Sequence, residues 1–195
     1  NDGYPRNQIP QPSPGVGGSC LTKDPILYST NKKGTINSSL GTYGRRVNKQ
    51  AGNFVLKVLN VFSKKINKPV TNMNILIVRL TFKGEPENYD IRFSVPVEVY
   101  NKLRNKCKNI FLWDGMIKKK HNLINNLISE TELEKKINKI DAILFLNNNK
   151  KNLKVFERIR GNNIKLIFDG WNQLDQAEVE KNKFLIYSTM GYIGC

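Results

Sequence analysis

The pattern of apolar residues after Pro69 constrains the fold more than any other feature of the chain. Short apolar runs alternate there with helical patterns, and the runs are suited to burial on both faces. The expected strands cover residues 74–81, 109–113, 142–146, 165–168 and 184–188, and the expected helices cover residues 95–106, 129–138 and 153–160. Strands that alternate with helices predict an α/β fold, in which a parallel sheet is covered by flanking helices.

The segment before Pro69 has a different pattern. Residues 1–19 hold four prolines and several glycines without apolar periodicity, which predicts a loop. Between residues 40 and 65, apolar side chains such as Val47, Val55 and Val58 recur at three- and four-residue steps, which predicts one long amphipathic helix. The apolar stripe of this helix needs a partner, either the next domain or another subunit. We therefore expect two parts, residues 1–68 and residues 69–195.

Length and composition limit the class of protein. The chain has 195 residues, of which 39% are hydrophobic, so it can bury a real core as one domain or as one domain with a remnant. Its longest apolar runs, residues 75–80 and 140–146, are far shorter than the roughly 20 residues that a membrane helix needs. Residues 1–19 also lack the apolar core of a signal peptide. We expect a soluble protein without a membrane partner.

The cysteines indicate a reducing compartment. Cys20, Cys107 and Cys195 are too few and too scattered for a disulfide framework. With His121 as the sole histidine, they also lack the spacing of zinc ligands, so we expect no metal site. A cytoplasmic protein fits this usage best.

The charge favours an anionic ligand. The chain has 32 Lys and Arg against 16 Asp and Glu, a formal net charge of +16, which attracts phosphates or nucleic acid. The same count is also typical of lysines on solvated faces. Since the chain has no recognised RNA- or DNA-binding motif, a nucleic-acid partner rests on charge alone and is not expected.

The most informative segment is PSPGVGGSCLTKDP, residues 12–25. Its glycines, Gly15, Gly17 and Gly18, allow the backbone to approach a ligand and to point N–H groups at negative oxygens. The same glycines could mark turns only.

A cysteine with charged neighbours follows these glycines. Cys20 would lie beside a bound anion, and Lys23 can help to hold it as the nucleophilic thiolate. Asp24 could orient a water molecule or take a proton. Without further support, Cys20 could equally be an inert small hydrophobic residue.

The segment closely resembles the nucleophile loop of the nucleotide-sugar dehydrogenases, which act on UDP-glucose, GDP-mannose or UDP-N-acetylmannosamine. That loop has a Gly-rich run, then Gly-Gly-x-Cys, then Lys-Asp, and all three of these reactive positions fall in register here. Arg45 and Asn48, in GRRVNKQ, match the start of the family's long central helix, whose apolar face builds the dimer.

The resemblance continues to the end of the chain. ILIVRLTFKGEPENYDIRFS, residues 75–94, is similar to the family's first C-terminal strand followed by Phe-Lys and Asp-x-Arg-x-Ser. It implies that Phe82 and Lys83 hold the nucleotide, and that Asp90, Arg92 and Ser94 form the loop beneath it. A lysine at the carboxyl end of the first parallel strand also lies where open α/β sheets bind ligands. IFLWDGMI, IDAILFL and IKLIFDGWNQLD resemble later family strands, so the match covers nearly all of the chain.

Two positions depart from the family pattern. Arg79 stands where the family usually has a glycine in the first strand, so a side chain occupies space that glycine leaves for close backbone approach. Trp171 stands where many members have an arginine that contacts the sugar nucleotide, so a bidentate donor is lost.

The resemblance implies a Rossmann-like C-terminal domain and a two-step oxidation. An NAD-dependent enzyme would convert the C6 alcohol of a UDP-hexose or UDP-N-acetylhexosamine to a carboxylate, with Cys20 forming a thiohemiacetal and then a thioester. The substrate contacts implied are Gly15, Gly17, Gly18, Arg45, Phe82 and Lys83, and the cofactor contacts are Lys23 and Arg92.

The chain lacks a G-x-G-x-x-G fingerprint after a strand, so we expect NAD to be bound mainly by an N-terminal domain that is absent here. The chain alone would then be inactive, and the long helix would form a homodimer. The alternative is a non-catalytic module for nucleotide-sugar binding and dimerisation.

Overall fold

The structure, a computed structural model, describes residues 11–30, 39–117, 126–159 and 163–194. One six-stranded sheet has the order β2-β1-β3-β4-β5-β6. Its strands are β1 (Asn74–Val78), β2 (Asn109–Trp113), β3 (Ala142–Phe145), β4 (Leu166–Asp169), β5 (Ile186–Thr189) and β6 (Tyr192–Ile193). Strands β1 to β5 are parallel and β6 is antiparallel to β5. The expected α/β class with a parallel sheet is confirmed.

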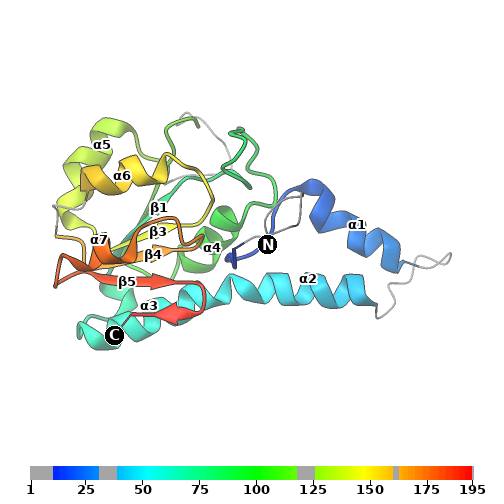
Figure 1. The fold of residues 1–195 in the computed structure, drawn as a ribbon, viewed down its shortest axis with the longest axis horizontal. Coiled ribbons are helices and arrows are strands. Elements are labelled where there is room, and N and C mark those ends of the chain that lie inside the picture. Colours follow the sequence, from blue (N-terminus) through cyan, green and yellow to red (C-terminus); the bar gives the residue numbers. More distant parts are fainter. Residues whose placement is uncertain (1–10, 31–38, 118–125, 160–162, 195) are drawn as a thin grey trace, which may run out of the picture.

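Helices cover both faces of the sheet (Figure 1). They are α1 (Ser19–Ser29), α2 (Leu40–Ala51), α3 (Asn53–Lys65), α4 (Val95–Leu103), α5 (Glu130–Lys136), α6 (Asn152–Ile159) and α7 (Gln176–Glu180), with short 3₁₀ turns at Val70–Asn72 and Ile137–Lys139. The sequence did not predict helices α1 and α7 or strand β6. Residues 118–120, His121 and Cys195, which entered the sequence argument, lie outside the described residues.

The period of two along each strand divides the core into two layers. Ile75 and Ile77 face one side, where they share a core with residues of α3 and α4. Leu76 and Val78 face the other side, where they pack with residues of α5, α6 and α7. This is why the strands read as continuous apolar runs: a sheet covered on both faces has no polar side.

Local capping fixes where several helices begin. Ser129 and Glu132 form a capping box at the start of α5, in which Ser129 Oγ accepts from the Glu132 backbone N–H and Glu132 Oε2 accepts from the Ser129 N–H. Ser39 and Thr42 do the same for α2. Such side chains satisfy backbone donors that have no partner within the first turn.

The helix expected over residues 40–65 consists of α2 and α3, which meet at Gly52. Gly52 keeps right-handed helical angles, with φ −61° and ψ −19°, so the two helices run almost end to end (Figure 1). The two halves have different surroundings. The apolar face of α3 is buried on the sheet, whereas α2 buries no residue fully and exposes Leu40, Tyr43 and Val47.

Helices α1 and α2 form an arm that projects from the sheet (Figure 1). The two helices contact each other closely at Gly41. A methyl group there would lie 2.6 Å from the Pro25 carbonyl oxygen, so a larger residue would not fit. Ser29 and Ser39 are hydrogen-bonded at the far end of the pair. Within the described residues, no helix is both long and apolar enough to cross a membrane.

Because α3 shares a core with the sheet, replacing Phe62 by alanine should destabilise the whole α/β unit. Phe62 is 2% exposed, and deleting a buried phenylalanine side chain typically costs about 3–5 kcal/mol. Chemical denaturation followed by circular dichroism would measure this loss. Val61→Ala, at a neighbouring position that is 39% exposed, is the matched control and should change the free energy of unfolding by no more than about 0.5 kcal/mol. Equal effects of the two variants would contradict the packing.

Candidate functional site

The strand order indicates a ligand site at the carboxyl edge of the sheet. The connection after β1 leads to β2 through α4 on one face, and the connection after the neighbouring strand β3 leads to β4 through α6 on the other face. Open α/β sheets bind ligands outside the carboxyl ends of the strands at such a point. Three segments that are distant in sequence meet at this edge. They are the Gly-rich loop, residues 11–18; the segment after β1, residues 79–94; and the segment after β3, residues 146–151. The turn after β4, residues 170–174, lies at the same edge.

The Gly-rich loop is seated on the end of β4 and on α2. A methyl group on Gly170 would lie 2.6 Å from Pro14 Cγ, so Pro14 packs against the bare backbone there. The Asn48 side chain holds the loop from the other side, since its Oδ1 accepts from the Val16 N–H at 2.7 Å and its Nδ2 donates to the Val16 carbonyl at 2.9 Å. Asn48, which matched the family pattern in the sequence, therefore fixes the loop that precedes Cys20.

The last two glycines of the loop contact the segment after β1 at very short range. A methyl group on Gly17 would lie 2.4 Å from the Phe93 carbonyl oxygen, and one on Gly18 would lie 2.9 Å from Phe82 Cδ2. Gly18 also has φ +88°, a conformation that residues with a side chain rarely adopt. Glycine is required at both positions for the loop to lie on Phe82.

Cys20 lies in the first turn of α1 rather than in the loop itself. Its side chain is exposed, and the helix has no side-chain cap at Gly18. Backbone N–H groups at the start of a helix stabilise negative charge, so this is a suitable place for a thiolate or for a bound anion. We expected a loop over residues 1–19 that leads into Cys20. This expectation is corrected at its end, because α1 already begins at Ser19.

Lys23 and Asp24 follow on the same helix, and both are exposed. Lys23 Nζ donates to Asp24 Oδ1 at 2.5 Å, and this hydrogen bond is the main cause that raises the pKa of Lys23. The charge of Cys20 also raises the pKa of Lys23, so the ammonium group lies within electrostatic range of the sulfur. The three residues that matched the family's reactive positions are together in space.

Arg92 reaches the same place from the segment after β1. Its guanidinium donates to both carboxylate oxygens of Asp90, which raises the pKa of Arg92 and lowers that of Asp90. Cys20 again contributes to the raised pKa of Arg92. Phe93, the next residue, contacts Gly17 of the loop that precedes Cys20, so this segment lies beside the start of α1.

Phe82 contacts the Gly-rich loop and Lys83 follows it, and their role in holding the nucleotide stays a prediction. Phe82 is half-buried beneath Gly18, and Lys83 Nζ lies 5.9 Å from the centre of the Phe82 ring. Ser94 caps α4, accepting from the Val97 N–H at 3.2 Å, so it ends the segment and is buried. Arg45 is half-buried on α2, one turn before Asn48, and its role in substrate binding stays a prediction.

Trp171 occupies the turn after β4, which Asp169 shapes. The Asp169 carboxylate is fully buried and accepts from the backbone N–H groups of Gln173 and Leu174 and from the Tyr187 hydroxyl. Burial raises the pKa of both Asp169 and Tyr187. The Trp171 indole N–H donates to the Leu146 carbonyl at 3.3 Å, so the ring spans the ends of β3 and β4.

The sequence argument missed the groups that support this edge from the side away from Cys20. They include Asp114 after β2 and Asn147, Asn148 and Asn149 after β3. Their hydrogen bonds join segments about 35 to 65 positions apart, which leave no local pattern. Within the described ranges, no three His, Cys, Asp or Glu side chains gather as metal ligands would.

The fold and the edge together define the class of protein. It is a Rossmann-like α/β protein with an exposed thiol, basic side chains and a Gly-rich loop at the ligand-binding edge of the sheet.

Comparison with known proteins narrows this class. No family model matches the chain. Its homologues and structural neighbours are nucleotide-sugar dehydrogenases, which confirms the resemblance found in the sequence. UDP-N-acetyl-D-mannosamine dehydrogenase from Pyrococcus horikoshii is 28% identical over 178 residues, which is 90% of this chain and 40% of that protein. The protein of the same name from Methanocaldococcus jannaschii is 28% identical over 193 residues, with 94% and 40% covered.

The solved structures agree. The structure of UDP-D-ManNAc dehydrogenase from Pyrococcus horikoshii matches 96% of this chain and 41% of that chain, with a TM-score of 0.74 and 28% identity. The chain thus spans about two fifths of the length of these relatives, and a C-terminal part of such a protein fits the match.

If Asn48 fixes the Gly-rich loop, Asn48→Ala should loosen that loop without unfolding the protein. Loss of two hydrogen bonds at a partly exposed position costs about 1 kcal/mol, so the Val16 amide should exchange its hydrogen roughly fivefold faster. Hydrogen-exchange mass spectrometry or NMR would measure the rate. Gln50→Ala, at an exposed position on the same helix, should leave it unchanged. An unaltered rate in Asn48→Ala would show that the loop is held by other contacts.

Proposed function

We propose that this chain is the central-to-C-terminal part of an NAD-dependent nucleotide-sugar 6-dehydrogenase that oxidises a UDP-hexose or UDP-N-acetylhexosamine to the uronic acid. The observation that carries this proposal is the close packing of the Gly-rich loop on Phe82, directly before Cys20, at the edge where parallel sheets bind ligands. The relatives are UDP-N-acetyl-D-mannosamine dehydrogenases, which supports the same reaction. Residues 1–68 would supply the nucleophile and the dimerisation helix, and residues 69–195 would bind the sugar nucleotide.

The basic side chains fit a diphosphate. Lys83, whose Nζ lies over the ring of Phe82, would contact the diphosphate of the sugar nucleotide. The N–H groups of Gly15, Gly17 and Gly18 would contact the same ligand, with Arg45 completing the substrate site. Lys23 and Arg92 are exposed cations near Cys20, and they would hold the phosphates of NAD.

The chemistry at Cys20 follows from its surroundings. NAD, when bound, accepts the hydride in each of the two oxidation steps. The Cys20 thiolate adds to the C6 aldehyde carbon, and the alkoxide that forms takes a proton to give a thiohemiacetal. Loss of a hydride from that carbon and of the hydroxyl proton gives a thioester. Asp24 would orient the water that attacks the thioester and take its proton, and the C–S bond then breaks to release the acid and the Cys20 thiolate.

The exposed face of the arm supports a homodimer. Leu40 is 89% exposed on α2, and Tyr28 is 85% exposed on α1. Apolar patches of this kind mark association surfaces. A second copy packed on α1 and α2 would cover them and bring two sites into one assembly.

Replacing Cys20 by serine should abolish formation of the acid, because an alkoxide does not form the thioester that water hydrolyses. The test uses the protein joined to, or mixed with, an NAD-binding domain such as that of the Pyrococcus relative, and measures NADH at 340 nm as about two equivalents per sugar. Cys107→Ser is the matched control, because burial raises the pKa of the Cys107 thiol to about 11 and the sulfur donates to the Leu103 carbonyl. Undiminished turnover in Cys20→Ser would contradict the mechanism.

Replacing Lys83 by alanine should weaken binding of UDP roughly tenfold, the loss expected for one charge-assisted hydrogen bond to phosphate. Isothermal titration calorimetry with UDP measures this without any need for turnover. Lys154→Ala, which removes an equal charge from the exposed face of α6, should change the Kd less than twofold at physiological salt. Equal weakening by both variants would mean that net charge, and not a built site, attracts the nucleotide. If UDP binds but Cys20 proves dispensable, the non-catalytic binding module is the better description.

A further inference from the structure

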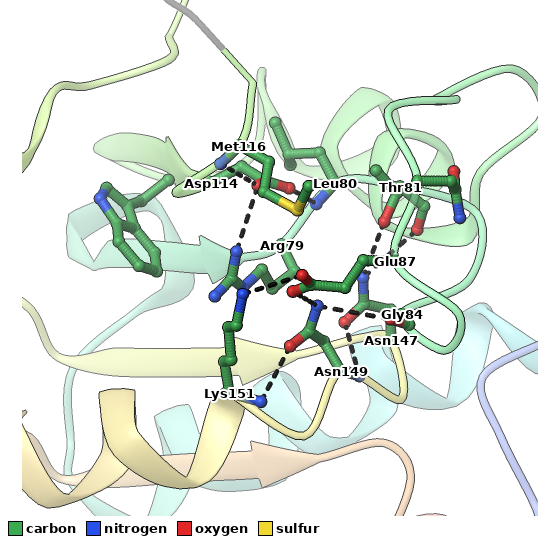
Figure 2. A network of polar contacts seen from close by, with 12 residues as sticks. Arg79, Leu80, Thr81, Gly84, Glu87, Asp114, Met116, Asn147, Asn149 and Lys151 are labelled. Atoms are coloured by element: carbon green, nitrogen blue, oxygen red, sulfur yellow. Dashed lines mark hydrogen bonds and ion pairs between the residues drawn. The ribbon is translucent and has the colours of Figure 1, made fainter.

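The segment that carries Phe82, Lys83 and Arg92 is held in place from the side away from Cys20. We call the groups that hold it the Arg79–Asn149 network, which consists of Arg79, Glu87, Asp114, Asn148, Asn149 and Lys151 (Figure 2). These residues come from the ends of β1, β2 and β3 and from the segment after β1. None of them is assigned to substrate, cofactor or Cys20 in the function proposed above.

The first part of the network lies where β1 ends. Arg79 has φ +66°, which residues with a side chain rarely adopt, and this turns the chain out of the sheet three residues before the end that the sequence predicts. Its side chain is 5% exposed and pairs with the buried carboxylate of Asp114, with 3.4 Å between NH1 and Oδ1. The guanidinium carbon also lies 5.3 Å from the centre of the Trp113 ring.

Asp114, which pairs with Arg79, also accepts hydrogen bonds from two backbone N–H groups. Its Oδ2 accepts from the Leu80 N–H at 2.8 Å, and its Oδ1 accepts from the Met116 N–H at 2.9 Å. A carboxylate buried at this depth is strongly disfavoured unless a cation compensates its charge. Arg79 therefore compensates the charge of the Asp114 carboxylate, which anchors Leu80, two residues before Phe82.

The second part interlocks the segments after β1 and β3. Asn148 Oδ1 accepts from the Gly84 N–H at 2.7 Å, and Asn149 Nδ2 donates to Glu87 Oε1 at 2.9 Å. Lys151 Nζ binds the other oxygen of Glu87 at 2.8 Å. The fit is close, since a methyl group on Gly84 would lie 2.1 Å from the Asn149 backbone nitrogen.

Glu87 joins the two parts. Its hydrogen bonds from Lys151 and Asn149 lower its pKa, and the charge of Arg79 lowers it further, so the carboxylate stays ionised beside the guanidinium. Arg79 Nε is buried without a hydrogen-bond partner among the described residues. Arg79 has a disfavoured backbone conformation and leaves one buried donor without a partner, and both features cost stability. Stability alone therefore does not explain an arginine at a position where the family has glycine.

The network acts on the site through the backbone. The Phe82 N–H donates to the Asp90 carbonyl at 3.0 Å, so residues 82–90 form a loop that this hydrogen bond closes. The network contacts the outer part of this loop, residues 84–87. Asp90 in turn binds Arg92, and Phe82 lies under Gly18. A shift of residues 84–87 would therefore move Arg92 relative to Cys20.

We propose that Arg79, Glu87 and Asn149 are positioning residues, which set the placement of Arg92 and Phe82 against the Cys20 turn and so maintain the positive field at the sulfur. This inference rests on the proposed role of Cys20 as the nucleophile. It assigns to Arg79 a role that the glycine of the family pattern cannot have.

The experiment compares the alkylation of Cys20 by two reagents. Iodoacetate is an anion and iodoacetamide is neutral, so the ratio of their rates, divided by the ratio for a short unstructured cysteine peptide, reports the local field. Peptide-resolved mass spectrometry separates Cys20 from Cys107 and Cys195 in the intact chain. The measurement needs neither NAD nor turnover.

The variants are chosen to separate positioning from charge and from folding. Asn149→Ala removes the bonds to Gly84 and Glu87 without a change of charge, and Asn101→Ala, at an exposed position on α4, is its control. Arg79→Gly restores the residue of the family pattern and relieves the backbone conformation, and Arg79→Lys tests rescue by a side chain that keeps the charge. Thermal denaturation is recorded for each protein.

We expect a ratio well above that of the peptide in the unchanged protein. Asn149→Ala and Arg79→Gly should each lower it roughly two- to fivefold, the effect of displacing one unit charge by a few ångströms at an exposed site, while Arg79→Lys should restore part of it. Asn101→Ala should have no effect.

Two other results are distinguishable. If Asn149→Ala and Arg79→Gly lower the melting temperature but leave the ratio unchanged, the network only stabilises the fold and the positioning role is wrong. If the unchanged protein shows no preference for iodoacetate over the peptide, Cys20 has no positive field. That outcome contradicts the proposed nucleophile site itself, and the inference with it.

Discussion

The site depends on close contact between the backbone of the Gly-rich loop and the carboxyl edge of the sheet. Gly17 and Gly18 contact the segment after β1, and the ring of Pro14 packs against Gly170 at the end of β4. None of these approaches leaves room for a Cβ atom. Because α1 begins directly after Gly18, the same contacts fix the first turn of that helix and hence the sulfur of Cys20. A loop with side chains at these positions would lift the start of α1 away from Phe82 and Phe93.

The sheet was predictable because its signal is local and strong. Each inner strand is buried on both faces, so each reads as an apolar run, and helices of ordinary length separate the runs. Helix α1 was missed because Pro25 lies inside it and its apolar residues follow no helical stripe. Helix α7 and strand β6 have five and two residues, which is too short for a periodic pattern to be recognised.

The site was predictable in its parts but not in its assembly. The family pattern indicated Cys20, Lys23 and Arg92, and the structure has Cys20 and Lys23 on α1, directly after the Gly-rich loop. Their roles stay predictions. The support from Asn149 had no signal in the sequence, since a run of asparagines reads as a loop and its partners lie more than 60 positions earlier. Arg79 shows the same limit. The sequence marks it as a departure from glycine, but its conformation is explained by Asp114, which follows a different strand.

Helices α2 and α3, which together cover residues 40–65, differ in how far their apolar faces are buried. α3 is committed to the sheet, where Val55 and Phe62 are almost fully buried, so its apolar face is not free to meet another subunit. The apolar side chains of α2 are exposed, and Asn48 on that helix holds the loop that precedes Cys20. Any partner that packs on α2 would therefore contact the same helix that positions the nucleophile loop. Association on the arm would therefore be coupled to order in the loop before Cys20 through α2.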